Sequence, residues 1–158
     1  MRRSSGRCAT TGVILFLAVL VLGGCSRGKK DVTSGHDQSV FNLKVGDCVL
    51  PPTAVKAEID KVRVLTCTQP HTEEAFAVIP YDKGDVYPGD KLLRAFADGA
   101  CLEKYQSYVG VAYTDSSLFY TYLLPSARGW SDGKDRNVIC LVTTTGEKLT
   151  TSVKGSNR

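Results

Sequence analysis

The sequence predicts an α+β domain in which one main helix packs on a mostly antiparallel sheet. Three observations lead to this fold class. Only one long segment, 93–108, repeats apolar residues at helical spacing. Several short segments are rich in β-branched and aromatic residues and end at proline or glycine. Four cysteines are spread over the same region, which is typical of an exported domain held by two disulfides.

The first 24 residues predict a signal peptide. Three arginines precede an apolar run, 13–22, and small residues then lead to Cys25. The Leu-Gly-Gly-Cys ending resembles the lipobox of bacterial lipoproteins, which implies that Cys25 receives a lipid and becomes the first residue of the mature chain. The alternative is a transmembrane anchor, but the uncharged stretch 9–24 has 16 residues and a spanning helix needs about 20. We therefore expect a cell-membrane protein, lipid-anchored on the extracytoplasmic face.

The mature chain is nearly neutral. The full sequence holds 20 Lys and Arg against 16 Asp and Glu, and removing Arg2, Arg3 and Arg7 leaves 17 against 16. This balance gives no electrostatic indication of a nucleic-acid partner. Residues 25–40 are polar and charged, and we expect them to form a flexible tether.

Residues 41–145 form the predicted folded domain, and the polar tail 146–158 is expected to be disordered. Within the domain, alternation and β-branched content predict strands at 45–50, 61–67, 74–79, 117–124 and 137–144. The helix is expected to begin with Asp90 as its N-cap and to end before Gly110. Its apolar stripe carries Cys101.

The four domain cysteines are Cys48, Cys67, Cys101 and Cys140. Their spacings of 19, 34 and 39 residues contain no C-x-x-C pair, so the alternative of a four-thiolate zinc site is disfavoured. Four cysteines allow three pairings. Because Cys101 lies on the buried stripe, we favour Cys101–Cys140 between helix and sheet and Cys48–Cys67 between N-terminal strands.

His71 is the one histidine of the predicted domain. Beside Thr72, Glu73 and Glu74 it could act as a general base or contribute one metal ligand. A metal site needs two or three such ligands, and no second histidine is available in the domain. We therefore favour a residue that caps the Pro70-His71 turn through a bond from its ring to the backbone. No cofactor, metal site or catalytic residue is predicted, and we expect no enzyme.

The glycine-containing segment 127–136 offers the best candidate binding residues: Trp130, Asp135 and Arg136. Tryptophan and arginine are enriched at binding hot spots because each combines a large contact area with a polar group. We expect these three residues to form one surface that contacts a protein or envelope partner. The alternative is that Trp130 covers the core while Asp135 and Arg136 pair across the loop.

An ordered set of short motifs resembles the septum formation domain family. They are Gly46-Asp47-Cys48, Val64-x-x-Cys67-x-x-Pro70-His71, Glu74-Ala75-Phe76-Ala77-Val78, Tyr87-Pro88-Gly89, Cys101, Pro125, Trp130 and Asp135-Arg136-x-x-x-Cys140. The resemblance runs from about residue 44 to 142. It implies an exported or membrane-attached bacterial protein with a link to cell division, and it implies no reaction or ligand.

The sequence thus predicts a membrane-anchored, non-catalytic binding domain that acts in cell division or envelope assembly. The alternative is a hydrolase or a metal-dependent envelope enzyme that uses His71.

Overall fold

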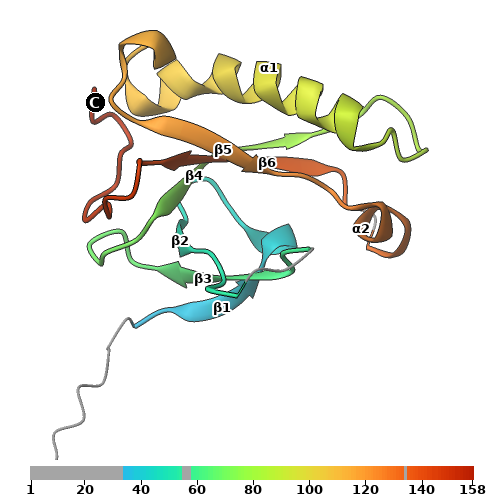
Figure 1. Ribbon diagram of the computed structural model, residues 1–158, viewed down its shortest axis with the longest axis horizontal. Coiled ribbons are helices and arrows are strands. Elements are labelled where there is room, and N and C mark those ends of the chain that lie inside the picture. Colours follow the sequence, from blue (N-terminus) through green and yellow to red (C-terminus); the bar gives the residue numbers. More distant parts are fainter. Residues whose placement is uncertain (1–33, 55–57, 134) are drawn as a thin grey trace, which may run out of the picture. The chain divides into compact units, whose positions relative to one another are not determined.

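The computed structural model describes residues 34–54, 58–133 and 135–158. The predicted signal peptide, Cys25 and the first part of the predicted tether lie outside the described residues. Within these ranges, six strands form one sheet in the order β1-β3-β2-β4-β6-β5, and all neighbours are antiparallel (Figure 1). The strands are β1 (His36–Ser39), β2 (Cys48–Leu50), β3 (Lys61–Leu65), β4 (Glu73–Pro80), β5 (Phe119–Leu123) and β6 (Asn137–Thr143).

The main helix, α1 (Asp90–Val109), lies across one face of the sheet and packs on β4, β5 and β6 (Figure 1). It begins one residue earlier than predicted. Gly89, with φ at 86°, is the N-cap, and Asp90 is already helical. The helix ends at Gly110, whose φ of 97° is the left-handed conformation that glycine adopts without strain. A six-residue helix, α2 (Ala127–Asp132), and two short 3₁₀ turns, η1 (Val40–Asn42) and η2 (Tyr113–Asp115), complete the described elements.

Apolar residues are buried on both faces of the sheet, and β6 shows why. Val138, Cys140 and Val142 belong to the cluster beneath α1, whereas Ile139 and Leu141 belong to a second cluster on the other face. Successive side chains of a strand point to opposite faces, so a strand covered on both sides reads as a continuous apolar run. The second cluster is completed by residues of η1, its C-cap, β2, β3 and β4, namely Val40, Leu43, Val49, Val62, Val64 and Ala75.

Both predicted disulfides are present. Cys101–Cys140 joins α1 to β6, with Cα atoms 5.6 Å apart, and Cys48–Cys67 joins β2 to the end of β3, with Cα atoms 5.3 Å apart. The first bond fixes the main helix on the sheet, and the second holds the N-terminal strands together. The expected fold class, with one main helix on an antiparallel sheet and two disulfides, is confirmed.

The end of the predicted tether is part of the sheet. Residues 36–39 form β1, which pairs with β3 from His36↔Val64 to Ser39↔Lys61, and Val40 is buried. The boundary at residue 40 was wrong because backbone hydrogen bonds hold β1 at the sheet edge. An edge strand needs few apolar side chains, so the polar sequence His-Asp-Gln-Ser gave no sign of it.

The predicted disordered tail also belongs to the folded domain, so this prediction was wrong. Leu149 and Val153 are only 2% and 1% exposed and pack in the cluster beneath α1. The backbone of Leu149 exchanges two hydrogen bonds of 2.9 Å with the backbone of His71. Two apolar residues in a polar segment are too few to produce a periodic pattern, yet they are enough to anchor it when a long-range partner exists.

Candidate functional site

Trp130 is part of the protein interior. The segment predicted as a loop forms α2, whose N-cap Ser126 accepts a hydrogen bond from the backbone N–H of Gly129 at 2.9 Å. This helix turns Trp130 inward, so that its side chain is 4% exposed and packs against Tyr81 and Leu93. Its Nε1–H donates to the carbonyl oxygen of Asp85 at 2.6 Å.

Arg136 contacts the buried Trp130 directly, and Asp135 holds the backbone of the following strand. The Arg136 guanidinium lies over the Trp130 ring, 3.8 Å from its centre, and donates to the Trp130 carbonyl oxygen at 2.8 Å. The Asp135 carboxylate accepts from the backbone N–H of Asn137 at 3.0 Å, and burial raises its pKa. The three residues do lie together as expected, but with Trp130 buried they do not form the predicted exposed surface. The alternative, a cover over the core, describes Trp130 correctly.

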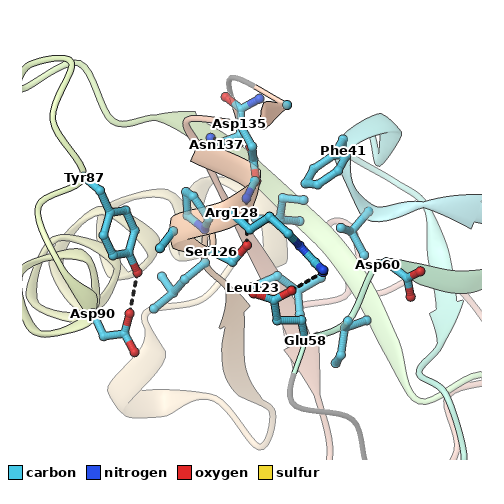
Figure 2. A pocket seen from close by; sticks show the side chains of 18 of the residues that line it. Phe41, Glu58, Asp60, Tyr87, Asp90, Leu123, Ser126, Arg128, Asp135 and Asn137 are labelled. Carbon is cyan, nitrogen blue, oxygen red and sulfur yellow. Dashed lines mark hydrogen bonds and ion pairs between the residues drawn. The ribbon is translucent and has the colours of Figure 1, made fainter. Parts of the chain in front are cut away.

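An open groove lies on the outer side of α2. It has a volume of about 830 Å³ and is bounded by η1, the loop before β3, the start of α1, the end of β5 and α2 (Figure 2). Phe41 and Ile59 contribute apolar surface and are 50% and 36% exposed. This groove could not be predicted from the sequence, because its walls come together only in the folded chain.

Carboxylates outnumber cationic groups along the groove. Among the described lining residues the acidic ones are Glu58, Asp60, Asp90, Asp132 and Asp135, and the basic ones are Arg94 and Arg128. Arg128 of α2 reaches across to form an ion pair with Glu58 of the loop before β3 (Figure 2). On another wall, Tyr87 donates to the Asp90 carboxylate, and burial together with this carboxylate raises the pKa of Tyr87 to about 12. Tyr87 therefore stays a protonated donor at neutral pH.

A second polar site is closed to solvent. Glu74 of β4 is 0% exposed, and its Oε1 accepts from the Tyr108 hydroxyl at 2.5 Å and from the Ser152 hydroxyl at 2.6 Å. Its Oε2 accepts from the backbone N–H of Val153 at 2.8 Å. Burial and the hydrogen bond to Glu74 raise the pKa of Tyr108 above its ordinary value. We call these four residues the Glu74 cluster; it joins β4, α1 and the tail.

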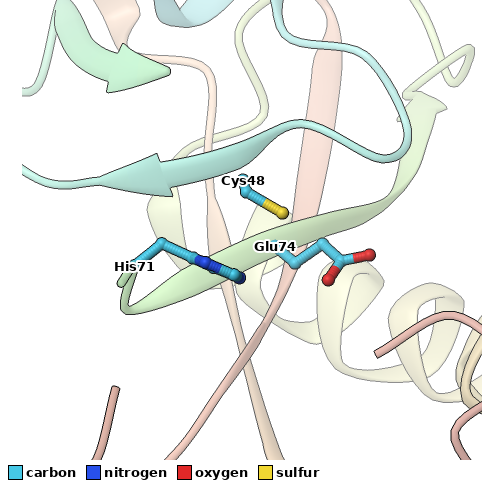
Figure 3. Close-up of side chains that lie close together, drawn as sticks. All are labelled: Cys48, His71 and Glu74. Atoms are coloured by element: carbon cyan, nitrogen blue, oxygen red, sulfur yellow. The ribbon is translucent and has the colours of Figure 1, made fainter. Parts of the chain in front are cut away.

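His71 lies beside the Glu74 cluster and is 0% exposed. Its Nδ1 is 2.7 Å from the carbonyl oxygen of Gln69, which is the ring-to-backbone contact expected for a residue that caps the turn. Its Nε2 is buried and has no hydrogen-bond partner among the described residues. Ligand atoms of Cys48, His71 and Glu74 lie within 4.8 Å of one another (Figure 3).

The role of Glu74 went unrecognised in the sequence, although one signal was present. Glu74 directly precedes the apolar run Ala-Phe-Ala-Val-Ile, and a carboxylate that is buried with such a run needs partners from elsewhere in the chain. The sequence could not supply these partners, because Tyr108 and Ser152 are 34 and 78 residues away.

A family model described as "Septum formation" matches residues 45–157 of the chain. The chain belongs to the septum formation family. The expected resemblance is thus confirmed, and the match extends beyond the predicted boundary to include the tail. No curated protein and no solved structure matches the chain.

The septum formation domain contains both disulfides, which indicate an extracytoplasmic location. Over the part of the chain that the structure describes, no helix is both long and apolar enough to cross a membrane.

Proposed function

We propose that this protein is a lipid-anchored, non-catalytic binding domain that acts outside the cytoplasmic membrane in cell division or envelope assembly. Its partner is a protein, and the groove beside α2 holds a segment of that partner. The open groove, with half-exposed Phe41 on one side and Arg128 on the other, is the observation that supports this proposal most directly.

The composition of the groove favours a particular partner chemistry. Excess carboxylates attract basic side chains, and Phe41 and Ile59 offer apolar contacts between them. An extended segment that alternates basic and apolar residues satisfies both requirements. Electrostatic attraction of this kind acts mainly on the association rate and on the choice of partner.

The groove walls are held before any partner binds. Trp130 and Arg136 fix α2 from the interior side, and the Arg128–Glu58 ion pair joins two walls. Because association is opposed by the ordering of loops and side chains, a groove with fixed walls binds more tightly than a mobile one.

Cys25 is the proposed site of lipid attachment. Metabolic labelling with a palmitate analogue should mark the wild-type protein and should not mark Cys25→Ser. A Cys25→Ser protein labelled as strongly as wild type would contradict the anchor and leave the groove proposal standing.

The burial of His71 supports a non-catalytic role, since a general base must reach the proton that it removes. The competing function, a hydrolase or metal-dependent envelope enzyme that uses His71, predicts that His71→Ala folds normally and loses activity. The binding proposal predicts that any loss of function in His71→Ala follows a loss of stability, measured by thermal unfolding of the same preparation.

Site-specific cross-linking in living cells tests the groove. A photoreactive residue placed at Phe41 should form an adduct with a partner, and the same residue at Val86 should not, because Val86 is 84% exposed but lies outside the groove. Asp132→Lys should weaken the Phe41 adduct, while Asp115→Lys, an exposed charge reversal in η2, should leave it unchanged. Equal adducts at Phe41 and Val86, or equal effects of the two reversals, would contradict the proposal.

A further inference from the structure

We propose that the dithiol form of this protein binds a zinc ion through Cys48, Cys67, His71 and Glu74, and that closing the Cys48–Cys67 disulfide expels the ion. The site is independent of the groove and of the proposed binding function. It would make the N-terminal half of the domain sensitive to the redox state of its surroundings.

The ligand atoms already converge. Cys48 stands on β2, His71 on the turn before β4 and Glu74 on β4, and their ligand atoms lie within 4.8 Å of one another (Figure 3). The sulfur of Cys67 is bonded to that of Cys48, so reduction of the disulfide leaves a second thiol beside this group. Two thiolates, one imidazole and one carboxylate are all established zinc ligands, and four ligands complete a tetrahedral site.

His71 carries the second, independent observation. Its Nδ1 can only donate to the Gln69 carbonyl oxygen, since a carbonyl has no proton to give. In the neutral ring, Nε2 is then unprotonated and has a lone pair available for bonding. This nitrogen is buried and has no hydrogen-bond partner among the described residues. A zinc-bound histidine usually donates one ring N–H to a backbone carbonyl or a carboxylate and binds the metal through its other nitrogen.

Glu74 adds negative charge to the same place. It is fully buried, and the described residues provide three hydrogen-bond donors and no cationic partner for it. Two donors occupy Oε1 and one occupies Oε2, so Oε2 retains a lone pair for a metal. The three donors would then orient a ligating carboxylate, as outer partners of metal ligands commonly do.

A limited rearrangement separates the observed cluster from a bound site, because the two sulfurs move apart when the disulfide is reduced while the other ligand atoms move closer. Zinc–sulfur bonds of about 2.3 Å and zinc–nitrogen bonds of about 2.0 Å place tetrahedral ligand atoms roughly 3.3–3.8 Å apart. The ligand atoms of Cys48, His71 and Glu74, with separations up to 4.8 Å, would therefore move closer by up to about 1.5 Å. Cys67 is half-buried, whereas Cys101 and Cys140 are fully buried, so an external thiol or disulfide reaches the Cys48–Cys67 pair more readily.

The chemistry balances with a small disulfide as the oxidant. Zinc binding to the dithiol form releases the two thiol protons. One thiolate then attacks the external disulfide and expels a first external thiolate, leaving a mixed disulfide. The second thiolate attacks the protein sulfur of that bond and releases the second external thiolate. Two electrons pass from the protein sulfurs to the external disulfide, and zinc loses two ligands and departs. A dithiol reductant reverses the sequence.

Zinc titration of the full chain in detergent tests the proposal. We use Cys8→Ser and Cys25→Ser as the background, so that these two thiols cannot bind the metal. Alkylation and peptide mapping count the molecules in which Cys48 and Cys67 are free. The expected result is one zinc per such molecule and none in the disulfide form, with thiolate-to-metal absorption when cobalt replaces zinc.

His71→Ala should weaken zinc binding by more than about 10-fold, and His36→Ala, an exposed histidine on β1, should have no effect. If His71→Ala does not fold, the wild-type comparison between dithiol and disulfide forms decides the question without it. Equal zinc binding by both redox forms, equal affinity in His71→Ala, or cobalt spectra without thiolate absorption would each overturn the proposal.

Discussion

The Glu74 cluster and the groove differ in how their polar side chains are satisfied, by buried hydrogen bonds in the first and by solvent in the second. In the cluster, each oxygen of a fully buried carboxylate receives its donors from the protein itself. In the groove, charged side chains such as Arg128, whose side chain is 71% exposed, remain in water even when they are paired. A buried polar group that loses its partner destabilises the fold, whereas an exposed ion pair contributes little to stability. The cluster therefore holds the domain together, and the groove is free to serve recognition.

Glu74→Ala is the most damaging substitution that this contrast predicts. It leaves two hydroxyls and one backbone N–H without an acceptor in the interior, and each buried unpaired group costs about 1–3 kcal/mol. We expect the free energy of unfolding to fall by about 4 kcal/mol, measured by urea denaturation. Glu103→Ala is the control, since Glu103 is an exposed carboxylate of α1 paired with Lys104. Similar midpoints for the two variants would show that the cluster does not hold the tail.

Trp130→Ala tests the wall that the groove shares with the core. Removing a buried tryptophan leaves a cavity and typically costs about 3–5 kcal/mol, and here it also removes the hydrogen bond to Asp85 and the ring beneath Arg136. We expect a value near 3 kcal/mol, because α2 lies at the surface and can partly collapse. Thermal unfolding, monitored by circular dichroism, measures this loss of stability. A variant as stable as wild type would show that Trp130 does not hold the groove wall in place.

Periodicity and cysteine position predicted the main features of this fold. The apolar stripe of α1 runs through Leu93, Ala97 and Cys101 and is buried as expected. With Cys101 on that stripe and Cys140 in a β-branched run, helix and strand had to face each other for the bond to form. Such local patterns report which side of an element is buried, and that was enough for the fold class and both disulfides.

The features that the sequence did not reveal all depend on contacts between distant segments. The backbone N–H of Val153 donates to the carboxylate of Glu74, which lies 79 residues earlier, and this bond holds Val153 in the interior. β1 exists because β3 offers it a free edge, and the orientation of Trp130 follows from a hydrogen bond to Asp85, 45 residues away. No window of neighbouring residues contains this information. The groove was missed for the same reason, since its charged residues come from segments separated along the chain.

The two disulfides should differ in how much they stabilise the domain. In the chain-entropy model the cross-link that spans 39 residues restricts the unfolded chain more than the one that spans 19. The expected losses are about 4 kcal/mol for Cys101→Ala/Cys140→Ala and about 3 kcal/mol for Cys48→Ala/Cys67→Ala. Urea denaturation of both pairs measures the difference. A larger loss for the second pair would show that Cys48, next to the Glu74 cluster, contributes through packing as well as through the cross-link.

The smallest expected effect concerns Glu73, the neighbour of Glu74 on β4. Glu73 is half-buried, and no hydrogen-bond donor for its side chain is found within the described ranges of the chain. Burial raises its pKa above the ordinary value of 4.5, so the folded protein holds the proton more tightly than the unfolded chain does. The folded state therefore loses stability as the pH rises from about 4.5 through the raised pKa, and the loss is complete above that value.

Glu73→Gln removes this charge and keeps the shape of the side chain. We expect the variant to be more stable than wild type at pH 7, by less than about 1 kcal/mol, and the difference should shrink as the pH falls toward 4.5. Urea denaturation at several pH values measures both quantities. Glu74→Gln is the matched comparison on the same strand, and it should be less stable than wild type at pH 7, because its amide replaces an acceptor that the cluster requires. If both glutamine variants shifted stability in the same direction, donors to the carboxylate would not be what separates these two neighbouring glutamates.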